Sequence, residues 1–106
     1  MAIHVPWART LIAGDYLSAV EIPTIAPGGA AEYEATLTRL EALVGACEHV
    51  VPGHGPVLDR ARAQRVLGED RAYLADLRAR AAAASLPPRR RSREQRRLHA
   101  LNAERL

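Results

Sequence analysis

The stretch HVVPGHGPV, which runs from His49 to Val57, holds the strongest structural signal in this sequence. Its two adjacent valines predict a short buried strand from about Glu48 to Val51, which Pro52 must end because proline has no N–H for the ladder. The glycines and the second proline then turn the chain sharply around His54. We expect a strand end that holds the His54 imidazole at its tip, where it could bind a metal. A turn that merely contains a histidine is the simpler alternative.

A second stretch, LIAGDYLS at residues 11–18, repeats this design with Asp15 in place of His54. In both stretches an apolar strand precedes a glycine, Gly14 or Gly53, whose missing Cβ lets the backbone turn sharply or approach another loop. Strand ends of α/β sheets converge on a shared crevice, and a carboxylate with an imidazole suits zinc, iron or manganese. Each signal alone is more typical of an ordinary turn.

The residues around these stretches predict strands, a loop and a helix. Two short apolar runs, AIHVP (2–6) and TLIAGDYL (10–17), suggest adjacent strands that form a hairpin. The prolines and paired glycines of SAVEIPTIAPGGAA (18–31) exclude a long regular element there. A helix is predicted from 31 to 44 by apolar residues at helical spacing: Tyr33, Leu37, Leu40 and Val44. Gly45, which follows, is the candidate C′ residue just beyond the helix end.

Two further helices follow the His54 turn. Asp59 is placed to cap a long helix over 60–84, in which Gly68 is the weak point. Two prolines at 87–88 break that helix, and Ser92 with Gln95 forms a candidate capping box for a short last helix bearing apolar residues, Leu98, Leu101 and Leu106. The predicted order is β-β-loop-α-β-α-α, an α/β arrangement with few strands.

Length and composition fit one small domain. A chain of 106 residues can bury a core of limited size. Its one cysteine, Cys47, excludes an internal disulfide and a cysteine-based zinc site, and we interpret it as a small buried hydrophobe. No stretch resembles a membrane span or a signal peptide, so no membrane partner is expected and the cytoplasm is the expected compartment.

Charge is unevenly distributed along the chain. Residues 1–80 contain eight arginines against ten acidic residues, a net charge of −2, whereas residues 81–106 contain seven against two, a net +5. The basic segment RRRSREQRR (89–97) could bind an acidic partner or nucleic acid, but arginines on a solvated helix face are the commoner explanation. It lacks the interleaved aromatic residues of a single-strand binding surface, so nucleic acid is not the expected partner.

Taken together, the two strand ends resemble a known family. The chain is similar to the C-terminal half of metallo-β-lactamase-fold hydrolases in the order of four stretches that precede a long helix: LIAGDYLS, EIP, YEATLTRLEALV and HVVPGHGPVLDRARA. The resemblance covers roughly residues 3–84. It implies that residues 1–84 form the C-terminal half of an αββα sandwich, and that residues 85–106 are a basic extension with a short helix.

The resemblance implies metal chemistry for two residues. In this superfamily the aspartate of the GD strand bridges two metal ions and the histidine of the PGHG turn ligates the second. By position, Asp15 and His54 would therefore be ligands of zinc, iron or manganese. The complete dinuclear centre lowers the pKa of a bound water and so supplies a hydroxide nucleophile that attacks a small-molecule substrate.

Other residues are weaker candidates for the functional site, and none is assigned as catalytic. Tyr16 and Ser18 are candidates to line a substrate pocket, although packing is the simpler role for Tyr16. His99, with Asn102 three residues later on the same helix face, could reach that pocket, but a structural or solvated face is favoured.

The sequence also departs from the family. The N-terminal half of such hydrolases supplies a His-x-His-x-Asp-His loop and a further histidine, which this sequence lacks. His4 and His49 are interpreted as strand residues rather than ligands. Two ligands should hold zinc weakly or not at all, so the chain alone should be inactive. Three explanations stay open: a truncated gene model that starts at an internal methionine, Met1, which we favour; a fragment that pairs with a separate N-terminal half; or a degenerate remnant.

Two functional hypotheses follow. The first is a metal-dependent hydrolase of the metallo-β-lactamase superfamily, present as its C-terminal half. The second is a non-enzymatic interaction module that uses the arginine-rich segment to bind an acidic partner or nucleic acid. The first is favoured because the GD and PGHG turns have no purpose in an electrostatic binder. Half a sandwich should expose a strand edge and an apolar face, which predicts self-association.

Overall fold

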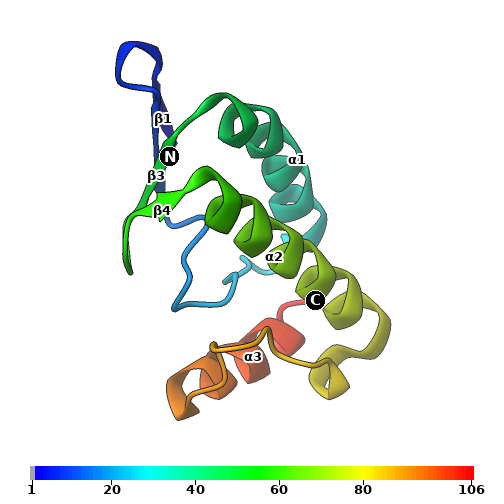
Figure 1. The fold of residues 1–106 in the computed structure, drawn as a ribbon. Helices are drawn as coiled ribbons and strands as arrows, with labels where there is room; N and C mark the ends of the chain where they lie inside the picture. Colours follow the sequence, from blue (N-terminus) through cyan, green and yellow to red (C-terminus); the bar gives the residue numbers. More distant parts are fainter. Residues whose placement is uncertain (1) are drawn as a thin grey trace.

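In the computed structural model, which describes residues 2–106, two helices pack on a four-stranded sheet and a third lies beside the end of the second (Figure 1). The predicted α/β class is therefore confirmed, whereas Met1 lies outside the described residues. The elements in chain order are β1 (Ile3–Val5), η1 (Pro6–Ala8), β2 (Thr10–Gly14), α1 (Ala30–Ala46), β3 (His49–Pro52), β4 (Leu58–Asp59), α2 (Arg60–Arg80), η2 (Ala81–Ala83) and α3 (Arg93–Glu104). Among residues 2–106, no helix is long and apolar enough to cross a membrane.

The strands lie in the sheet in the order β1-β2-β3-β4. β1 and β2 form the predicted antiparallel hairpin. β2 and β3 are parallel, because α1 carries the chain back to the starting end of the sheet before β3 begins. β4 was not predicted from the sequence; it is a two-residue strand, antiparallel to β3, that forms as the His54 turn reverses the chain.

The two faces of the sheet differ in exposure. Leu11, Val50 and Leu58 point to one face and are fully buried in the core that α1 and α2 complete. On the opposite face Ile3 pairs with Ile12, and both side chains are more than a third exposed. No layer covers this face among residues 2–106, and its apolar side chains, Ile3, Val5, Ile12 and Val51, lie beside the polar Thr10, His49 and Asp59.

We expect the protein to self-associate through this face at moderate concentration. Ile12→Thr keeps a β-branched side chain but makes it polar, and should weaken the association about tenfold, equivalent to about 1.4 kcal/mol. Val20→Thr changes an exposed valine outside the sheet and should leave the association unchanged. Sedimentation velocity over a concentration series measures this, and a wild-type protein that stays monomeric throughout would contradict it.

α1 confirms the predicted helix but not its predicted end. Its buried side chains include Leu37, Leu40 and Val44, the stripe expected from the spacing. The prediction for Gly45 is wrong, because the helix continues to Ala46 and Cys47 caps it with an extended backbone. The chain passes directly from the helix into the sheet, because the next N–H, that of Glu48, donates to the Arg9 carbonyl at 2.8 Å. No residue in the left-handed conformation is therefore needed to end the helix. Cys47 is buried, as predicted.

α2 begins as predicted and ends earlier. The Asp59 carboxylate accepts a hydrogen bond from the Arg62 N–H at 2.8 Å, which confirms the N-cap. The helix ends at Arg80 instead of residue 84, and Ala81 adopts a left-handed φ of 50°. Asp76 explains the early end: its carboxylate binds the Arg80 guanidinium and also accepts from the Ser85 N–H at 2.8 Å, which draws the chain back against the helix.

Asp76 should stabilise the fold in a pH-dependent way. Hydrogen bonds from Arg80, and then from the Ser85 N–H, lower the pKa of this carboxyl to about 2. A native pKa below the unfolded value gives stability that is present above about pH 4 and lost as the pH falls towards 2. Asp76→Asn should therefore lower the free energy of unfolding at pH 7, and the difference from wild type should shrink between pH 4 and 2 in urea titrations.

Glu48→Gln is the matched control for that experiment, because it removes a carboxylate from an exposed ion pair with Arg9. A difference between wild type and Asp76→Asn that stayed constant from pH 7 to 2 would show that Asp76 acts without its charge.

α3 shows a buried stripe that is polar, where an apolar one was expected. Ser92 caps the helix by accepting from the Gln95 N–H at 3.3 Å, but the reciprocal half of the predicted capping box is absent. The Gln95 side chain instead accepts from the Ile22 N–H at 2.6 Å. The buried residues of α3 are Gln95, His99 and Asn102, at helical spacing, whereas Leu106 is 47% exposed. The stripe faces a loop whose backbone needs hydrogen-bond partners.

Candidate functional site

The ends of β2 and β3 lie side by side. Gly14 pairs with Pro52 in the parallel ladder, just after a bulge in β2. The Gly53 N–H donates to the Gly14 carbonyl oxygen at 2.6 Å and extends the contact past the last strand residue. Asp15 and His54 directly follow these two glycines, so the fold brings both predicted ligand positions to one edge of the sheet.

This close approach depends on both glycines, as expected from the sequence. A Cβ on Gly53 would lie 2.9 Å from the Gly14 carbonyl oxygen, a backbone atom that is held in the sheet. Gly14 itself has a φ of 60°, a left-handed conformation that strains residues with a side chain. Glycine at these positions therefore allows the two strand ends to touch.

Gly53→Ala should push the two strand ends apart. We expect a loss of about 1–3 kcal/mol in the free energy of unfolding, typical of overpacking against atoms that cannot yield. The matched control is Gly68→Ala in α2, where a Cβ meets nothing within 4 Å and should stabilise the helix by about 1 kcal/mol. Urea unfolding of both variants measures the difference, and equal effects at the two positions would contradict this view of Gly53.

Asp15 and His54 are both exposed to solvent. The His54 side chain is 60% exposed, and its Nδ1 lies 3.8 Å from the Glu21 Oε1 atom. Glu21 was part of the EIP stretch but was not singled out from the sequence, because no spacing rule connects a loop carboxylate to a distant turn. Among residues 2–106, no group of three or more histidine, cysteine, aspartate or glutamate side chains is arranged to hold a metal ion.

A cleft of about 450 Å³ opens beside Asp15. One wall is the irregular segment 15–29, here called the cleft loop, and the other is the first turn of α1. The lining residues are Asp15, Tyr16, Glu21, Ile22, Thr24, Ala26, Gly29, Glu32 and Tyr33. With three carboxylates and two phenol rings, the cleft is acidic and partly aromatic.

Tyr16 lies in this cleft and packs on Tyr33. Their ring centroids are 4.9 Å apart with an interplanar angle of 53°, a tilted aromatic pair. Burial is the main cause that raises the pKa of the Tyr33 hydroxyl far above its usual value, and the charge of Asp70 adds to it. The Tyr33 hydroxyl is therefore largely withdrawn from water, although Tyr33 lines part of the cleft. Tyr16 combines the packing role with a place in the predicted pocket.

Ser18 is buried and does not line the cleft. Its hydroxyl oxygen accepts hydrogen bonds from the N–H groups of Val20 and Glu21, at 3.2 and 3.0 Å, which shapes a turn in the cleft loop. The structure thus places Ser18 behind the wall of the cleft, where it orients Glu21.

His99 and Asn102 also lie away from the cleft and hold the fold together. His99 Nε2 lies 3.0 Å from the Ala82 carbonyl, to which it must donate, and Nδ1 then accepts from the Tyr73 hydroxyl at 2.8 Å. Asn102 accepts from the Ile25 N–H at 3.0 Å and donates to the Tyr73 hydroxyl at 3.0 Å. These contacts are those of the structural helix face that the sequence favoured over a pocket role.

The two remaining histidines lie in strands, as interpreted from the sequence. His4 is half-buried in β1, and His49 is the exposed first residue of β3. His49 pairs with Thr10 at the end of β3 opposite to the His54 turn, so it lies apart from the candidate site.

Comparison with protein-family models, curated proteins and solved structures gives no match. Membership of the metallo-β-lactamase superfamily therefore stays a prediction from the sequence motifs.

Proposed function

We propose that this chain is the C-terminal half of a metal-dependent hydrolase of the metallo-β-lactamase superfamily, with Asp15 and His54 as metal ligands. The observation that supports this most is the parallel pairing of β2 with β3, in which Gly14 and Gly53 touch. A carboxylate and an imidazole thereby leave the sheet at the same edge, beside a cleft able to admit a small molecule.

The residues present suit part of a metal site. Asp15 and His54 offer an oxygen and a nitrogen donor, a set that zinc, iron and manganese accept, and both side chains are exposed to solvent. Glu21 lies close enough to His54 to orient the ring, as carboxylates often do for metal-bound histidines. A bound metal would polarise the substrate and lower the pKa of a water molecule.

The remaining ligands would come from another polypeptide segment that covers the apolar sheet face. The row of Ile3 and Ile12 on that face, with its neighbour Val51, is the kind of surface on which a second sheet packs in a sandwich. In this proposal the self-association predicted above is what happens when that second layer is not supplied.

Within this proposal, the groups of the chain have separate tasks. Asp15 and His54 would hold the metal, and the rigid strand ends would limit where it can sit. Tyr16 and Tyr33 form an aromatic wall that excludes water from one side of the cleft.

The interaction-module alternative has less support. Arg90, within the basic segment, is fully buried beside Asp70 and so cannot contact a partner, whereas Arg97 only shares an exposed ion pair with Glu94. Binding of nucleic acid that weakens steeply with salt and does not depend on metal would nevertheless favour that alternative.

Zinc titration is the direct test. Half of a ligand set should give about 4–5.5 kcal/mol of binding free energy, a Kd of about 0.1–1 mM, measurable by isothermal titration calorimetry and by NMR of the histidine rings. His54→Ala and Asp15→Asn should each weaken binding at least about tenfold, and EDTA should reverse the NMR changes.

His49→Ala is the matched control for His54→Ala, because it removes an exposed histidine from the other end of β3. Zinc binding that His49→Ala abolishes and His54→Ala leaves intact would overturn the assignment of the site.

A further inference from the structure

The cleft loop (15–29) contains no helix or strand (Figure 1). Many of its backbone N–H and carbonyl groups are hydrogen-bonded by the C-terminal segment (85–106). Side chains of α3 and the residue after it replace the partners that a neighbouring strand would give. The bonds are from the Ile22 N–H to Gln95 at 2.6 Å, from the Ile25 N–H to Asn102 at 3.0 Å, from Asn102 to the Pro23 carbonyl at 2.7 Å, and from Arg105 to the Ile25 carbonyl at 2.9 Å.

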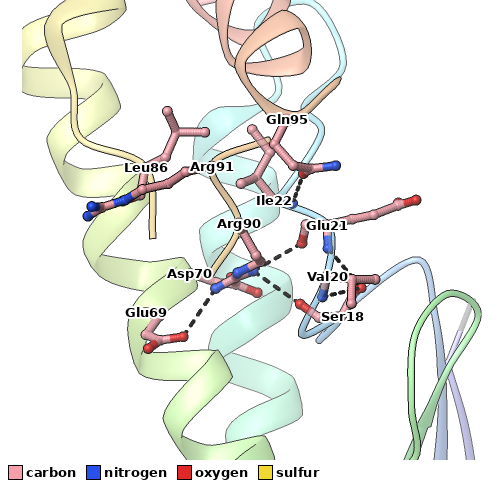
Figure 2. A network of polar contacts seen from close by, with 10 residues as sticks. All are labelled: Ser18, Val20, Glu21, Ile22, Glu69, Asp70, Leu86, Arg90, Arg91 and Gln95. Atoms are coloured by element: carbon pink, nitrogen blue, oxygen red, sulfur yellow. Dashed lines mark hydrogen bonds and ion pairs between the residues drawn. The ribbon is translucent and has the colours of Figure 1, made fainter. Parts of the chain in front are cut away.

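Arg90 makes a second set of contacts with the cleft loop, which Figure 2 shows. Its side chain is 1% exposed, and Nη1 lies 2.6 Å from the Asp70 carboxylate in α2. The same nitrogen donates to two carbonyl oxygens of the cleft loop, those of Ser18 at 3.1 Å and Glu21 at 3.0 Å. Nη2 lies 3.4 Å from the Glu69 carboxylate. The guanidinium therefore joins α2 to the loop.

These contacts restrain Glu21 on both sides of its backbone. Its carbonyl accepts from Arg90, and its N–H donates to the Ser18 hydroxyl oxygen at 3.0 Å. The next residue, Ile22, is held by Gln95. The Glu21 side chain is thereby directed into the cleft and towards His54, with Nδ1 and Oε1 3.8 Å apart.

We propose that Arg90, in the C-terminal segment, is a positioning residue. By binding the Ser18 and Glu21 carbonyls it fixes the backbone of the cleft loop and places the Glu21 carboxylate beside His54. The proposal goes beyond metal binding and holds whether or not Asp15 and His54 bind a metal. It gives one arginine of the basic segment, Arg90, a structural role inside the molecule.

Arginine suits this contact by its reach. Three acceptors, the Asp70 carboxylate and the two loop carbonyls, share the two N–H groups of Nη1, so at least one N–H is bifurcated. Asp70 supplies the counter-charge that a buried cation needs. A lysine ammonium carries three N–H groups but ends closer to its Cα than Nη1 does, so Arg90→Lys should keep the ion pair with Asp70 but lose at least one loop carbonyl.

The test compares loop order with global stability. Arg90→Met alone leaves the Asp70 charge buried without a partner, which is strongly destabilising, so the informative variant is the double substitution Arg90→Met/Asp70→Leu. Replacing a buried ion pair by apolar residues of similar size is often neutral for stability. The double variant nevertheless lacks both hydrogen bonds from Arg90 to the cleft loop.

Amide hydrogen exchange followed by NMR gives the main measurement. In the double variant the Ile22 and Ile25 amides should exchange at least about tenfold faster than in wild type, because the loop has lost two hydrogen bonds to a charged donor. Core amides such as Leu11 should be unchanged, and nuclear Overhauser contacts between Glu21 and the His54 ring should weaken. Arg90→Lys should fall between wild type and the double variant.

Leu74→Ala is the destabilised control, because it opens a cavity in the core and removes no hydrogen bond to the cleft loop. It should speed exchange of core and loop amides together. Loop amides in the double variant that stay as protected as in wild type, or that change only in proportion to core amides, would overturn the positioning role. If the wild type binds no zinc while loop exchange responds as expected, the proposed metal site fails and the positioning role stands.

Discussion

The parallel contact between β2 and β3 is the constraint on which the rest of the structure depends. Parallel strands need a long crossover, which α1 supplies, and they end at the same edge of the sheet, which antiparallel neighbours do not. Gly14 and Gly53 extend the contact by one hydrogen bond beyond the ladder. Because side chains that follow such ends must emerge together, the position of the candidate site is a consequence of topology and needs no special folding of the loops.

A second constraint is the demand of buried backbone groups for partners. A loop packed against a core loses water and must find other hydrogen bonds, or each unpaired group costs about 1–3 kcal/mol. In this protein the polar stripe of α3 and the Arg90 guanidinium meet that demand for residues 15–29. No buried side-chain nitrogen or oxygen among residues 2–106 lacks a partner. The buried polar residues of the C-terminal segment are therefore part of the core, namely Arg90, Gln95, His99 and Asn102.

Local signals explain which parts of the fold could be predicted from the sequence. The hairpin, α1 and the Asp59 cap depend on periodicity, turn residues and capping chemistry within a few positions, and all three are confirmed. The adjacency of the two glycine-ended strands also follows from the pattern β-α-β. The early end of α2 could not be predicted, because it depends on Asp76 binding Ser85 after the chain has turned.

The burial of the Arg90 side chain could not be predicted for a related reason. A run of arginines with a positive local charge is typical of a solvated face, and nothing local distinguishes Arg90 from its neighbours. Its partners are 20 to 72 positions away in the chain. Such long-range closure has a consequence for biosynthesis: the cleft wall is translated well before residues 90–105, whose side chains hold its backbone. A nascent chain that carries a finished sheet and both long helices would still present an open, unshaped cleft until residues 90–105 emerge.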